Sequence, residues 1–432
     1  MESNLQAAGS AQENPVQTLT PVQTLTTSCC IVGGGPAGMM LGFLLARAGV
    51  EVIVLEKHAD FLRDFRGDTI HPSTLQLMFE LGLLEEFLQR PHQQLTQVSG
   101  EIQGYVVTIA DFSHLPTHCK FIAFMPQWDF LNFLAEKGKQ YPQFHVRMES
   151  EVTGLLQENG RVTGVRARTP HGNLEIHASL TVGADGRHST VRQAAGFEVI
   201  DLGAPIDVLW MRMTRHASDP VQALGRFQSG KILITLDRGD YWQCAYVISK
   251  GTFEAVREKG LSSFRQDIAE IAPFLSERTQ EIASWSDVKL LTVAVDRLRT
   301  WSKPGLLCIG DSAHAMSPIG GVGINLAIQD AVAAANILAS NLSRGSVSDE
   351  QLSRVESRRS LPARMTQAVQ VFLHKRFLGP ALGGQILTGR VPLPLRLLHR
   401  FPRLRRIPAR VVGLGFRPEH IHTPDSRARP AH

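Results

Sequence analysis

The sequence predicts an α/β protein whose parallel sheet layer is interrupted by a β-rich region and followed by a basic, partly helical C-terminal tail. Three observations predict this fold class. A strand, a glycine turn, a helix and a second strand follow one another within residues 27–55, which is the order of a βαβ unit. Over residues 206–248 the sequence pattern changes to that of short antiparallel strands. Beyond Gly305, a buried strand over 306–309 and a long helix over 323–340 return to the α/β pattern.

Length and composition are those of a globular protein. The chain has 432 residues, enough for two or three domains, with 43% apolar and 20% charged residues. These values exclude disordered, collagen-like and disulfide-scaffold chains. The five cysteines have no metal-binding spacing, so we expect reduced thiols and no metal site. The uncharged segment 29–46 is short and glycine-rich for a membrane span, and no basic residue precedes Arg47, so we expect a cytoplasmic protein.

The remaining elements are predicted in order along the chain. Residues 1–26 are polar, contain PVQTLT twice, and are expected to be a flexible leader. Helices are expected over 73–89, 128–139 and 253–274. Asn159-Gly160 joins two strands of a hairpin, over 152–158 and 161–168. The predicted strands of the β-rich region are 208–213, 231–236 and 241–248, with a tight turn over 237–240.

The first glycine motif follows the first predicted strand and opens a helix. Gly33, Gly35 and Gly38 form a GxGxxG pattern, and Glu56 ends the next strand. In this context the glycines permit a tight turn and a close backbone approach to a pyrophosphate, while the helix N-terminus faces the phosphates. Glu56 is placed to accept a hydrogen bond from a ribose hydroxyl. The pattern predicts a Rossmann-like dinucleotide site for a ribose without a 2′-phosphate.

A second motif, VGADGRHSTVR, occupies residues 182–192. Asp185 lies between two glycines after an apolar strand, and Ser189 and Arg192 follow it. Two interpretations stay open at this point. The segment is either a turn that leads into a capped helix, or part of the same ligand site.

The third motif joins CIGDSAH at 308–314 to SPIGGVGIN at 317–325. Asp311 ends a buried strand and is placed to accept a hydrogen bond from a sugar-chain hydroxyl. Over residues 320–323, glycines allow backbone N–H groups to point at a ligand, and the next helix adds the positive end of its dipole. Such a site suits negative charge that develops on a heterocyclic ring.

In this order, GGGPAG with Glu56, GADGRHSTVR and GDSAHAMSPIGGVGINLAIQD strongly resemble the motifs of the FAD-dependent monooxygenases of the para-hydroxybenzoate hydroxylase-like, or aromatic hydroxylase, family. The resemblance covers residues 28–360. It implies an FAD-binding domain whose first part is 27–200 and whose return is 296–385. It also implies a β-rich substrate domain over 201–295, with the tail over 386–432.

The resemblance implies a set of cofactor-binding residues from the three motifs and their neighbours. The first-motif glycines would face the pyrophosphate, Glu56 the adenosine ribose, Asp311 the ribityl chain, and residues 318–325 the flavin's pyrimidine end. Asp185 belongs to a motif linked to both FAD and the nicotinamide cofactor, and Arg66 and Gln127 match more loosely. The full set is Gly33, Gly35, Pro36, Ala37, Gly38, Glu56, Lys57, Arg66, Gln127, Asp185, Gly310, Asp311, Pro318, Gly321, Gly323, Ile324 and Asn325.

The family implies a monooxygenase that uses NADPH or NADH and O₂. The flavin would be reduced, would form a hydroperoxide, and would transfer one oxygen atom to an aromatic or polycyclic substrate by hydroxylation or epoxidation. A flavin-dependent halogenase, a reductase and a non-catalytic flavin-binding regulatory protein are the alternatives. The sequence lacks the WxWxIP segment of the halogenases. It identifies no catalytic base and no nucleic-acid-binding motif, and small molecules are the expected partners.

Several histidine and aromatic residues allow more than one interpretation. For His314 the sequence favours a structural role within its motif over that of a catalytic base. For His71 it favours a position at the start of a helix. Five large side chains of the β-rich region belong either to its core or to a substrate cavity. These are Trp210, Met211, Met213, Trp242 and Tyr246.

The net positive charge of the chain lies in the tail. The whole chain has a net charge of +5, and residues 386–432 hold ten Arg against Glu419 and Asp425, or +8, which leaves −3 for the rest. Two interpretations of the tail stay open. Its Leu395, Leu397, Leu398, Phe401 and Ile407 either pack on the protein or contact an anionic membrane surface with the arginines. Deletion from Leu387 onward is expected to leave a folded, flavin-loaded protein.

Overall fold

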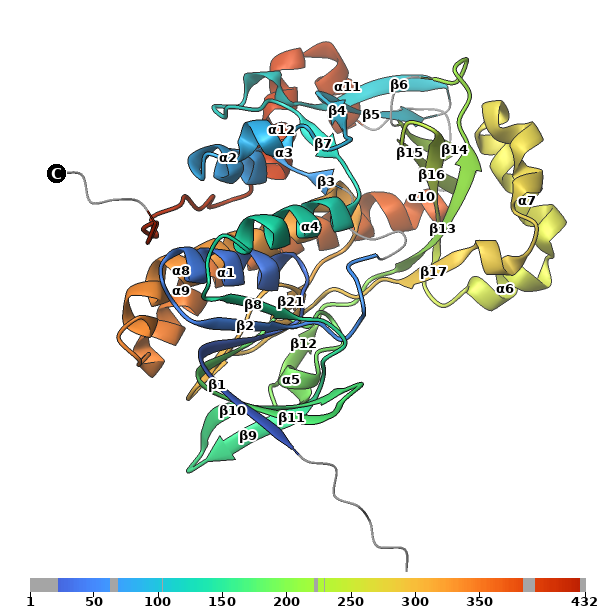
Figure 1. Ribbon diagram of the computed structural model, residues 1–432. Helices are drawn as coiled ribbons and strands as arrows, with labels where there is room; N and C mark the ends of the chain where they lie inside the picture. Colours follow the sequence, from blue (N-terminus) through green and yellow to red (C-terminus); the bar gives the residue numbers. More distant parts are fainter. Residues whose placement is uncertain are drawn as a thin grey trace, which may run out of the picture.

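A parallel sheet forms the centre of the α/β layer in the computed structural model, which describes residues 22–62, 69–102, 104–220, 224–228, 230–383 and 393–427. Its strand order is β20-β11-β1-β2-β8, and each neighbouring pair is parallel (Figure 1). Apolar runs at the strand ends are buried on both faces, as expected of a parallel sheet. These strands are β1 (Gln23–Val32), β2 (Val52–Leu55), β8 (Phe144–Arg147), β11 (Gly172–Gly183) and β20 (Leu306–Cys308).

Long helices flank this sheet. The apolar helix α1 (Pro36–Arg47) contacts α4 (Gln127–Gly138) and α8 (Val322–Leu342), and α8 in turn contacts α9 (Asp349–Leu373). Within the described residues, one helical segment, Ile319–Leu342, is long and apolar enough to cross a membrane. Because 72% of its most apolar stretch is buried inside the protein, packing against α1 and α9 accounts for that composition.

A second large sheet is mostly antiparallel and has the order β17-β13-β16-β15-β14-β5-β6. Five of its strands come from the β-rich region, but β5 and β6 come from residues 97–111, so the sheet extends beyond the expected bounds of 201–295. Helices α6 (Phe253–Glu258) and α7 (Leu261–Ile271) lie along its outer side (Figure 1). The strands are β5 (Gln97–Ile102), β6 (Tyr105–Asp111), β13 (Ile206–Thr214), β14 (Leu224–Gln228), β15 (Lys231–Asp237), β16 (Tyr241–Ser249) and β17 (Lys289–Thr292).

Smaller elements connect the two large sheets. Two three-stranded sheets have the orders β3-β7-β4 and β12-β18-β21, and β19, β10 and β9 extend the first sheet. The remaining strands are β3 (Thr69–Ile70), β4 (Gln93–Leu95), β7 (Ile122–Phe124), β9 (Glu151–Glu158), β10 (Arg161–Thr169), β12 (Val199–Asp201), β18 (Asp296–Leu298), β19 (Ser302–Lys303) and β21 (His314–Ala315). The short helices are α2 (Pro72–Glu80), α3 (Leu84–Phe87), α5 (Thr190–Ala194), α10 (Gly379–Leu382), the 3₁₀ helices η1 (Phe112–His114), η2 (Pro273–Glu281), η3 (Trp285–Asp287), η4 (Gly310–Ser312) and η5 (Ile319–Gly321), and the π-helix η6 (His374–Leu378).

Two predicted helices are each divided by a glycine. The helix expected over 73–89 is α2 followed by α3, because Gly82 adopts a φ of 71° between them. The helix expected over 253–274 is α6 followed by α7, with Gly260 at a φ of 87°. A positive φ is outside the right-handed helical region, so the chain turns at both positions.

Ordered structure begins earlier than expected. Strand β1 starts at Gln23, inside the predicted leader 1–26, because residues from Gln23 onward pair in parallel with β11 from Leu174 onward. The long β11 supplies a partner that the apolar pattern of β1 alone does not indicate. Residues 1–21 lie outside the described part of the chain.

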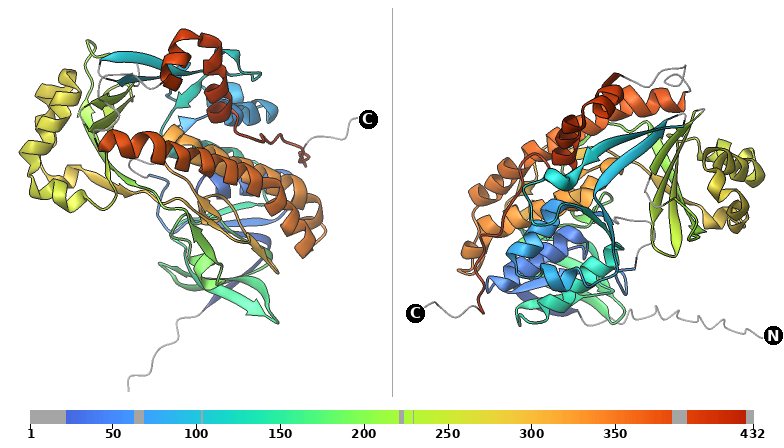
Figure 2. Two further views of the ribbon diagram at one scale, coloured as in Figure 1. Left: turned by 180° about the vertical axis from the view of Figure 1, so that it is seen from behind. Right: turned by 90° about the horizontal axis from the view of Figure 1, so that it is seen from above.

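The described part of the tail is folded onto the protein. Helices α11 (Leu393–Arg400) and α12 (Arg406–Gly413), joined by η8 (Pro402–Arg405), pack on β6. The chain then runs back along the α/β layer, where the Arg47 guanidinium donates to the Thr423 carbonyl at 2.8 Å. Figure 2 shows these red helices as an outer layer over the cyan strands.

Candidate active site

The first glycine motif forms a tight turn between β1 and α1. Gly33 has a φ of 109°, and a Cβ there would stand 2.4 Å from the Ala184 carbonyl oxygen. A Cβ at Gly38 would stand 2.0 Å from the Gly33 oxygen, whereas a Cβ at Gly35 would meet no atom within 4 Å. Helix α1 begins after Gly35 with Pro36 and Ala37, and no side chain in the described chain caps it. The turn therefore leaves an open space in front of a helix N-terminus.

Glu56 braces this turn. It is buried at the end of β2, and its Oε2 accepts a hydrogen bond from the Gly34 N–H at 3.0 Å. Its Oε1 accepts from the His58 N–H at 3.1 Å and lies 2.5 Å from His58 Nδ1. The neighbouring Lys57 is exposed. The predicted ribose acceptor thus also fixes the backbone of the glycine turn.

The second motif lies directly beside the first. A Cβ at Gly33 would stand 2.8 Å from the Asp185 N atom. Asp185 accepts a hydrogen bond from the Ser189 hydroxyl at 2.5 Å and from the Val191 N–H at 3.2 Å, while Ser189 caps α5. Burial raises the pKa of Asp185, and the bond from Ser189 partly offsets this. The structure therefore shows a capped-helix turn that is packed against the glycine motif.

The third motif meets the other two at the carboxyl edge of the parallel sheet. The Ser312 hydroxyl donates to the Gly183 carbonyl at 2.6 Å, which ties it to β11. Gly310 has a φ of 62° and faces Ala37 of α1. The Asp311 carboxylate is a third exposed and lies 3.8 Å from the Arg187 guanidinium of the second motif. Parallel strands bring their C-terminal ends to one edge, where ligands of such sheets bind.

The glycine stretch before α8 adopts two successive left-handed residues. Gly320 and Gly321 have φ values of 75° and 62°, and a Cβ at Gly321 would stand 2.3 Å from the Thr69 hydroxyl. That hydroxyl donates to the Gly321 carbonyl at 3.0 Å. Pro318, Gly323 and Ile324 are half-buried around this turn.

The Asn325 side chain is occupied by protein contacts. Its Oδ1 accepts from the His71 N–H at 2.9 Å and the Thr74 hydroxyl at 2.7 Å, and its Nδ2 donates to the Thr69 carbonyl at 3.2 Å. Asn325 therefore joins the start of α8 to β3 and α2. Arg66 lies outside the described residues. Gln127 begins α4, after β7, which pairs with β3 at Thr69, so its segment lies at the same edge.

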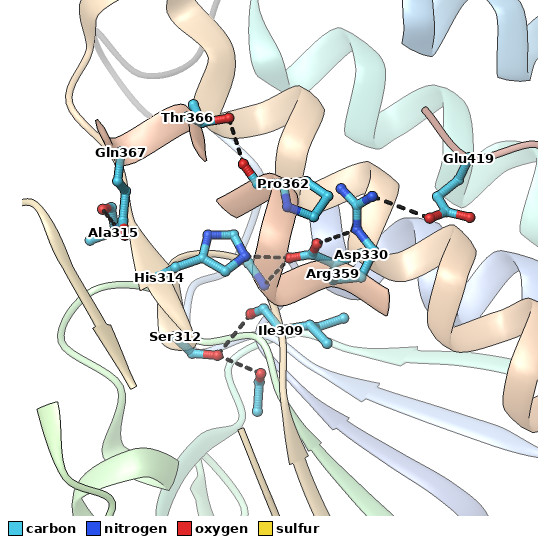
Figure 3. A network of polar contacts seen from close by, with 12 residues as sticks. Ile309, Ser312, His314, Ala315, Asp330, Arg359, Pro362, Thr366, Gln367 and Glu419 are labelled. Carbon is cyan, nitrogen blue, oxygen red and sulfur yellow. Dashed lines mark hydrogen bonds and ion pairs between the residues drawn. The ribbon is translucent and has the colours of Figure 1, made fainter. Parts of the chain in front are cut away.

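His314 belongs to a buried network that the sequence did not indicate as a whole. Its Nε2 lies 2.6 Å from Asp330 Oδ2, and the Arg359 Nε donates to Asp330 Oδ1 at 2.9 Å (Figure 3). Arg359 also contacts Glu419 at 3.2 Å, and the Gly310 N–H donates to Asp330 at 3.1 Å. Burial alone would raise the pKa of Asp330, but the charges and hydrogen bonds of His314 and Arg359 hold it below its usual value.

This network makes His314 a structural partner, as predicted. Asp330 is the single acidic residue of the apolar helix α8, and this was the one indication of the network in the sequence. Arg359 and Glu419 are distant in sequence, and only the fold brings them to it.

A side chain of α9 also forms hydrogen bonds with the backbone of the turn around Pro318. Gln370 accepts from the Ser317 N–H at 3.0 Å and donates to the carbonyls of Ser317 and Ile319 at 3.0 and 3.2 Å. One helical turn later, His374 Nε2 lies 2.9 Å from the Ser317 hydroxyl. Burial lowers the pKa of His374, which favours its neutral form. Neither residue could be predicted from the sequence, because no motif surrounds Gln370 in α9 or His374 at the start of η6.

His71 lies directly before α2, as expected, and its side chain is buried. Its Nδ1 lies 2.7 Å from the Val412 carbonyl oxygen of α12. Burial lowers its pKa to about 4, against a smaller upward effect of that hydrogen bond. His71 thus connects the tail to β3 and Asn325 in its neutral form. His188 is exposed.

Strand alternation separates the large side chains of the β-rich region. Four of the five large side chains pack on the outer side of the sheet against α7 and η2. These are Met211, Met213, Trp242 and Tyr246. Trp210 alone packs on the opposite face, with Val208, Val247 and side chains from η6 and α10. On that face the Arg212 guanidinium lies 4.8 Å from the Tyr241 ring. The core interpretation is therefore correct for the four, and a cavity role stays open for Trp210.

A polar cavity of about 290 Å³ lies between the β3-β7-β4 sheet and the β15–β16 turn. Phe124 on its wall is three residues before Gln127. Opposite Phe124, Arg215 and Asp237 form an ion pair at 2.9 Å. Its lining residues are Gln93, Gln94, Leu95, Phe124, Arg215, Asp237 and Gly239.

Comparison with known proteins agrees with this geometry. Residues 26–370 match the family described as FAD binding domain. The chain is 33% identical to 6-methylpretetramide 4-monooxygenase of Streptomyces rimosus over 395 residues, which cover 91% of this chain and 93% of that protein. The chain belongs to the FAD-dependent monooxygenases of the aromatic hydroxylase type.

Solved structures of flavin monooxygenases share this fold. The OxyS anhydrotetracycline hydroxylase of Streptomyces rimosus superposes with a TM-score of 0.70 at 23% identity, over 90% of this chain and 76% of that one. PqsL of Pseudomonas aeruginosa, a probable FAD-dependent monooxygenase, also gives 0.70, at 21% identity, over 84% of this chain and 99% of that one. A flavin-dependent brominase, Bmp2, has the fold as well, at 15% identity.

FAD is the cofactor of this flavin monooxygenase, and the chain has features that fit it. The open space at Gly35, in front of an uncapped helix N-terminus, suits a pyrophosphate. The partly exposed Asp311 carboxylate is available to a hydroxylated chain at the same sheet edge. The left-handed turn at Gly320 and Gly321 suits the close approach of a planar ring.

Proposed function

We propose that this flavin monooxygenase hydroxylates a fused-ring phenolic substrate, with NADPH or NADH as the reductant. The observation that carries the proposal is the 33% identity to 6-methylpretetramide 4-monooxygenase across nearly the full length of both chains. A rifampicin monooxygenase of Streptomyces venezuelae is 28% identical over 70% of this chain and 61% of that protein. The bound flavin supplies the chemistry that activates O₂ and transfers one oxygen atom.

The chain's own residues hold the cofactor at the carboxyl edge of the parallel sheet. We assign the pyrophosphate to the turn at Gly33 and Gly35 and to the backbone N–H groups of Ala37 and Gly38 at the start of α1. We assign the adenosine ribose to Glu56. Asp311 holds the ribityl chain. Segment 318–325 borders the flavin's pyrimidine end through its backbone, because the Asn325 side chain is already bonded to β3 and α2.

The inner face of the second sheet supports a substrate role. Trp210, Phe227 and Ile234 share this face, which is turned toward α9 and α10 rather than toward α7. Flat aromatic and aliphatic side chains suit a fused-ring ligand. We therefore propose that the FAD domain, interrupted by this sheet, closes over the substrate and excludes water.

Oxygen incorporation tests the proposal. The purified protein would be incubated with NADPH or NADH, ¹⁸O₂ and a panel of three- and four-ring phenols. We expect a phenol that stimulates reductant oxidation and a product that contains one ¹⁸O atom. A product that requires halide or contains no ¹⁸O would indicate a halogenase or a reductase. Bound FAD with no stimulated turnover would favour a regulatory protein.

A further inference from the structure

The outer side of the tail helices exposes large apolar side chains. They come from α11, η8 and α12, and their exposed fractions range from 36% to 64%. Leu393 and Leu397 are one helical turn apart and therefore lie on one side of α11. The apolar set is Leu393, Leu397, Phe401, Leu404 and Ile407. We use the name arginine face for the surface that these five residues form together with the exposed arginines of the same segment, which are Arg396, Arg400, Arg403, Arg406 and Arg410.

Exposed arginines alternate with these side chains. Between Leu393 and Gly413 the sequence contains six Arg and no Asp or Glu. Arg405 is partly buried because it donates to the carbonyls of Leu398 and His399 at 3.0 and 3.2 Å, which fixes α11 against η8. The five exposed arginines are Arg396, Arg400, Arg403, Arg406 and Arg410.

The opposite side of the same elements is anchored to the protein. Ala409 and Gly413 are buried, and a Cβ at Gly413 would stand 2.7 Å from a methyl group of Leu115. The Val412 carbonyl bonds to His71. The arginine face is therefore a preformed surface on a fixed support. Figure 2 shows the red tail helices at the periphery of the molecule, beside the cyan strands that include β6.

We propose that the arginine face docks this protein peripherally on an anionic lipid bilayer. Apolar side chains that alternate with arginines, without acidic residues, are typical of helices that lie in the membrane interface. The arginines would attract the headgroups while Phe401 and Ile407 enter the acyl boundary. With eight residues each, α11 and α12 are too short to span a bilayer.

A second copy of the chain is a poorer occupant. Pairing this face with itself would bring five exposed arginines against five others, and like charges at an interface oppose association. The apolar stripe on α9, which includes Leu361 and Phe372 with exposed fractions of 55% and 59%, has a single arginine, Arg364, between these two residues. That stripe therefore serves as a control surface rather than as part of the proposal.

Vesicle flotation of the full-length, FAD-loaded protein tests this inference, which does not depend on the substrate. Vesicles would contain equal parts of phosphatidylglycerol and phosphatidylcholine, or phosphatidylcholine alone. We expect binding to the anionic vesicles at low salt, loss of binding near ~1 M salt, where the screening length falls to about 3 Å, and none to the neutral vesicles. Absence of binding to anionic vesicles at low salt would overturn the proposal.

Matched double variants test whether vesicle binding depends on the arginine face or on any exposed apolar surface. F401Q/I407Q and R400Q/R403Q should each lower vesicle partitioning by about tenfold or more, whereas L361Q/F372Q on α9 should not. All four positions of the first two variants are exposed, so FAD content and the thermal midpoint check that each protein is folded. Equal loss in the α9 control would contradict the assignment. So would a dimer on gel filtration that F401Q/I407Q dissociates, because a second copy would then occupy the face.

Discussion

The Arg359 guanidinium and the Asp330 carboxylate form an ion pair, 2.9 Å from Nε to Oδ1, in which the side chains are 1% and 0% exposed. Asp330 also accepts from the Gly310 N–H, next to Asp311, and Arg359 reaches Glu419 of the tail. The pair therefore links the edge of the proposed flavin site to the C-terminal segment through charges that water cannot reach.

Breaking this pair should destabilise the protein strongly. Arg359→Met leaves the buried Asp330 carboxylate without its guanidinium partner, while Arg358 still pairs with Glu419, and loss of one partner of a buried pair costs about 3–5 kcal/mol. Denaturant unfolding of the FAD-loaded protein measures this. Arg299→Met, which breaks the fully exposed pair with Glu198, serves as the control and should leave the midpoint unchanged. Equal midpoints for both variants would contradict the buried network.

Stability should fall on mild acidification because of His71. Its pKa is about 4 in the folded protein and 6.5 in the unfolded chain, so between these values the unfolded state binds the extra proton. Stability is therefore fully present above pH 6.5 and decreases as the pH falls to 4, by about 3 kcal/mol at most. Unfolding free energies of the wild type and His71→Gln, measured from pH 4 to 7, should show a shallower pH dependence in the variant. Parallel curves would mean that His71 is accessible to protons in the fold.

Gly35→Val should abolish FAD retention without unfolding the protein. Its side chain would enter the open space before α1, where we place the pyrophosphate, and would meet no protein atom near its Cβ. FAD content after gel filtration and the apoprotein thermal midpoint measure the two effects. Gly38→Ala is the contrasting variant, because its Cβ would clash with the Gly33 carbonyl and should lower the midpoint itself.

Two further variants test the same assignment by affinity. Asp311→Ala and Glu56→Ala should each weaken FAD binding by about 1–3 kcal/mol if the sugar hydroxyls lose their acceptors. Glu56→Ala should have the larger effect, since it also releases the Gly34 N–H. Unchanged FAD affinity in both would refute the assignment of the glycine and aspartate motifs.

Trp210 and Met211 are neighbours in β13 with opposite roles. Trp210→Ala should raise KM for the substrate or increase NAD(P)H oxidation without product, because its face is the one we propose for the substrate. Met211→Ala should instead lower stability by about 2–5 kcal/mol, since its side chain is fully buried against α7. Steady-state kinetics and denaturant unfolding of the two variants distinguish the faces. The reverse pattern would place the substrate on the α7 side.

Deletion from Leu387 onward should prevent correct folding, contrary to the expectation from sequence. The truncated chain loses Val412, Glu419 and Thr423, the partners of His71, Arg359 and Arg47. Buried polar groups without partners are costly, so we expect aggregation or loss of FAD. Sedimentation and the flavin absorbance of the soluble fraction measure this. A monomeric, flavin-loaded truncation would show that these contacts are dispensable.

The features that are encoded within a few residues could be predicted from the sequence. The glycine turn at Gly33 and Gly38 needs small residues at fixed spacing, so GxGxxG with Glu56 predicted the βαβ unit and its dinucleotide site. Asn159 and Gly160 likewise adopt the positive φ values, 49° and 78°, that their hairpin requires. The order of the three motifs was enough to indicate the family.

Which distant residues meet, and which face of a strand is covered by a helix, depends on the tertiary fold. Alternation places Trp210 and Met211 on opposite faces, but the packing of α7 on one side determines which face is closed. No local sequence pattern predicts the contacts of Arg359 and Glu419. Arg359 meets Asp330 because α9 packs on α8, and it meets Glu419 because the tail returns to α9. Such contacts depend on how the whole chain packs, since burial and charge pairing are properties of the assembled fold rather than of a segment.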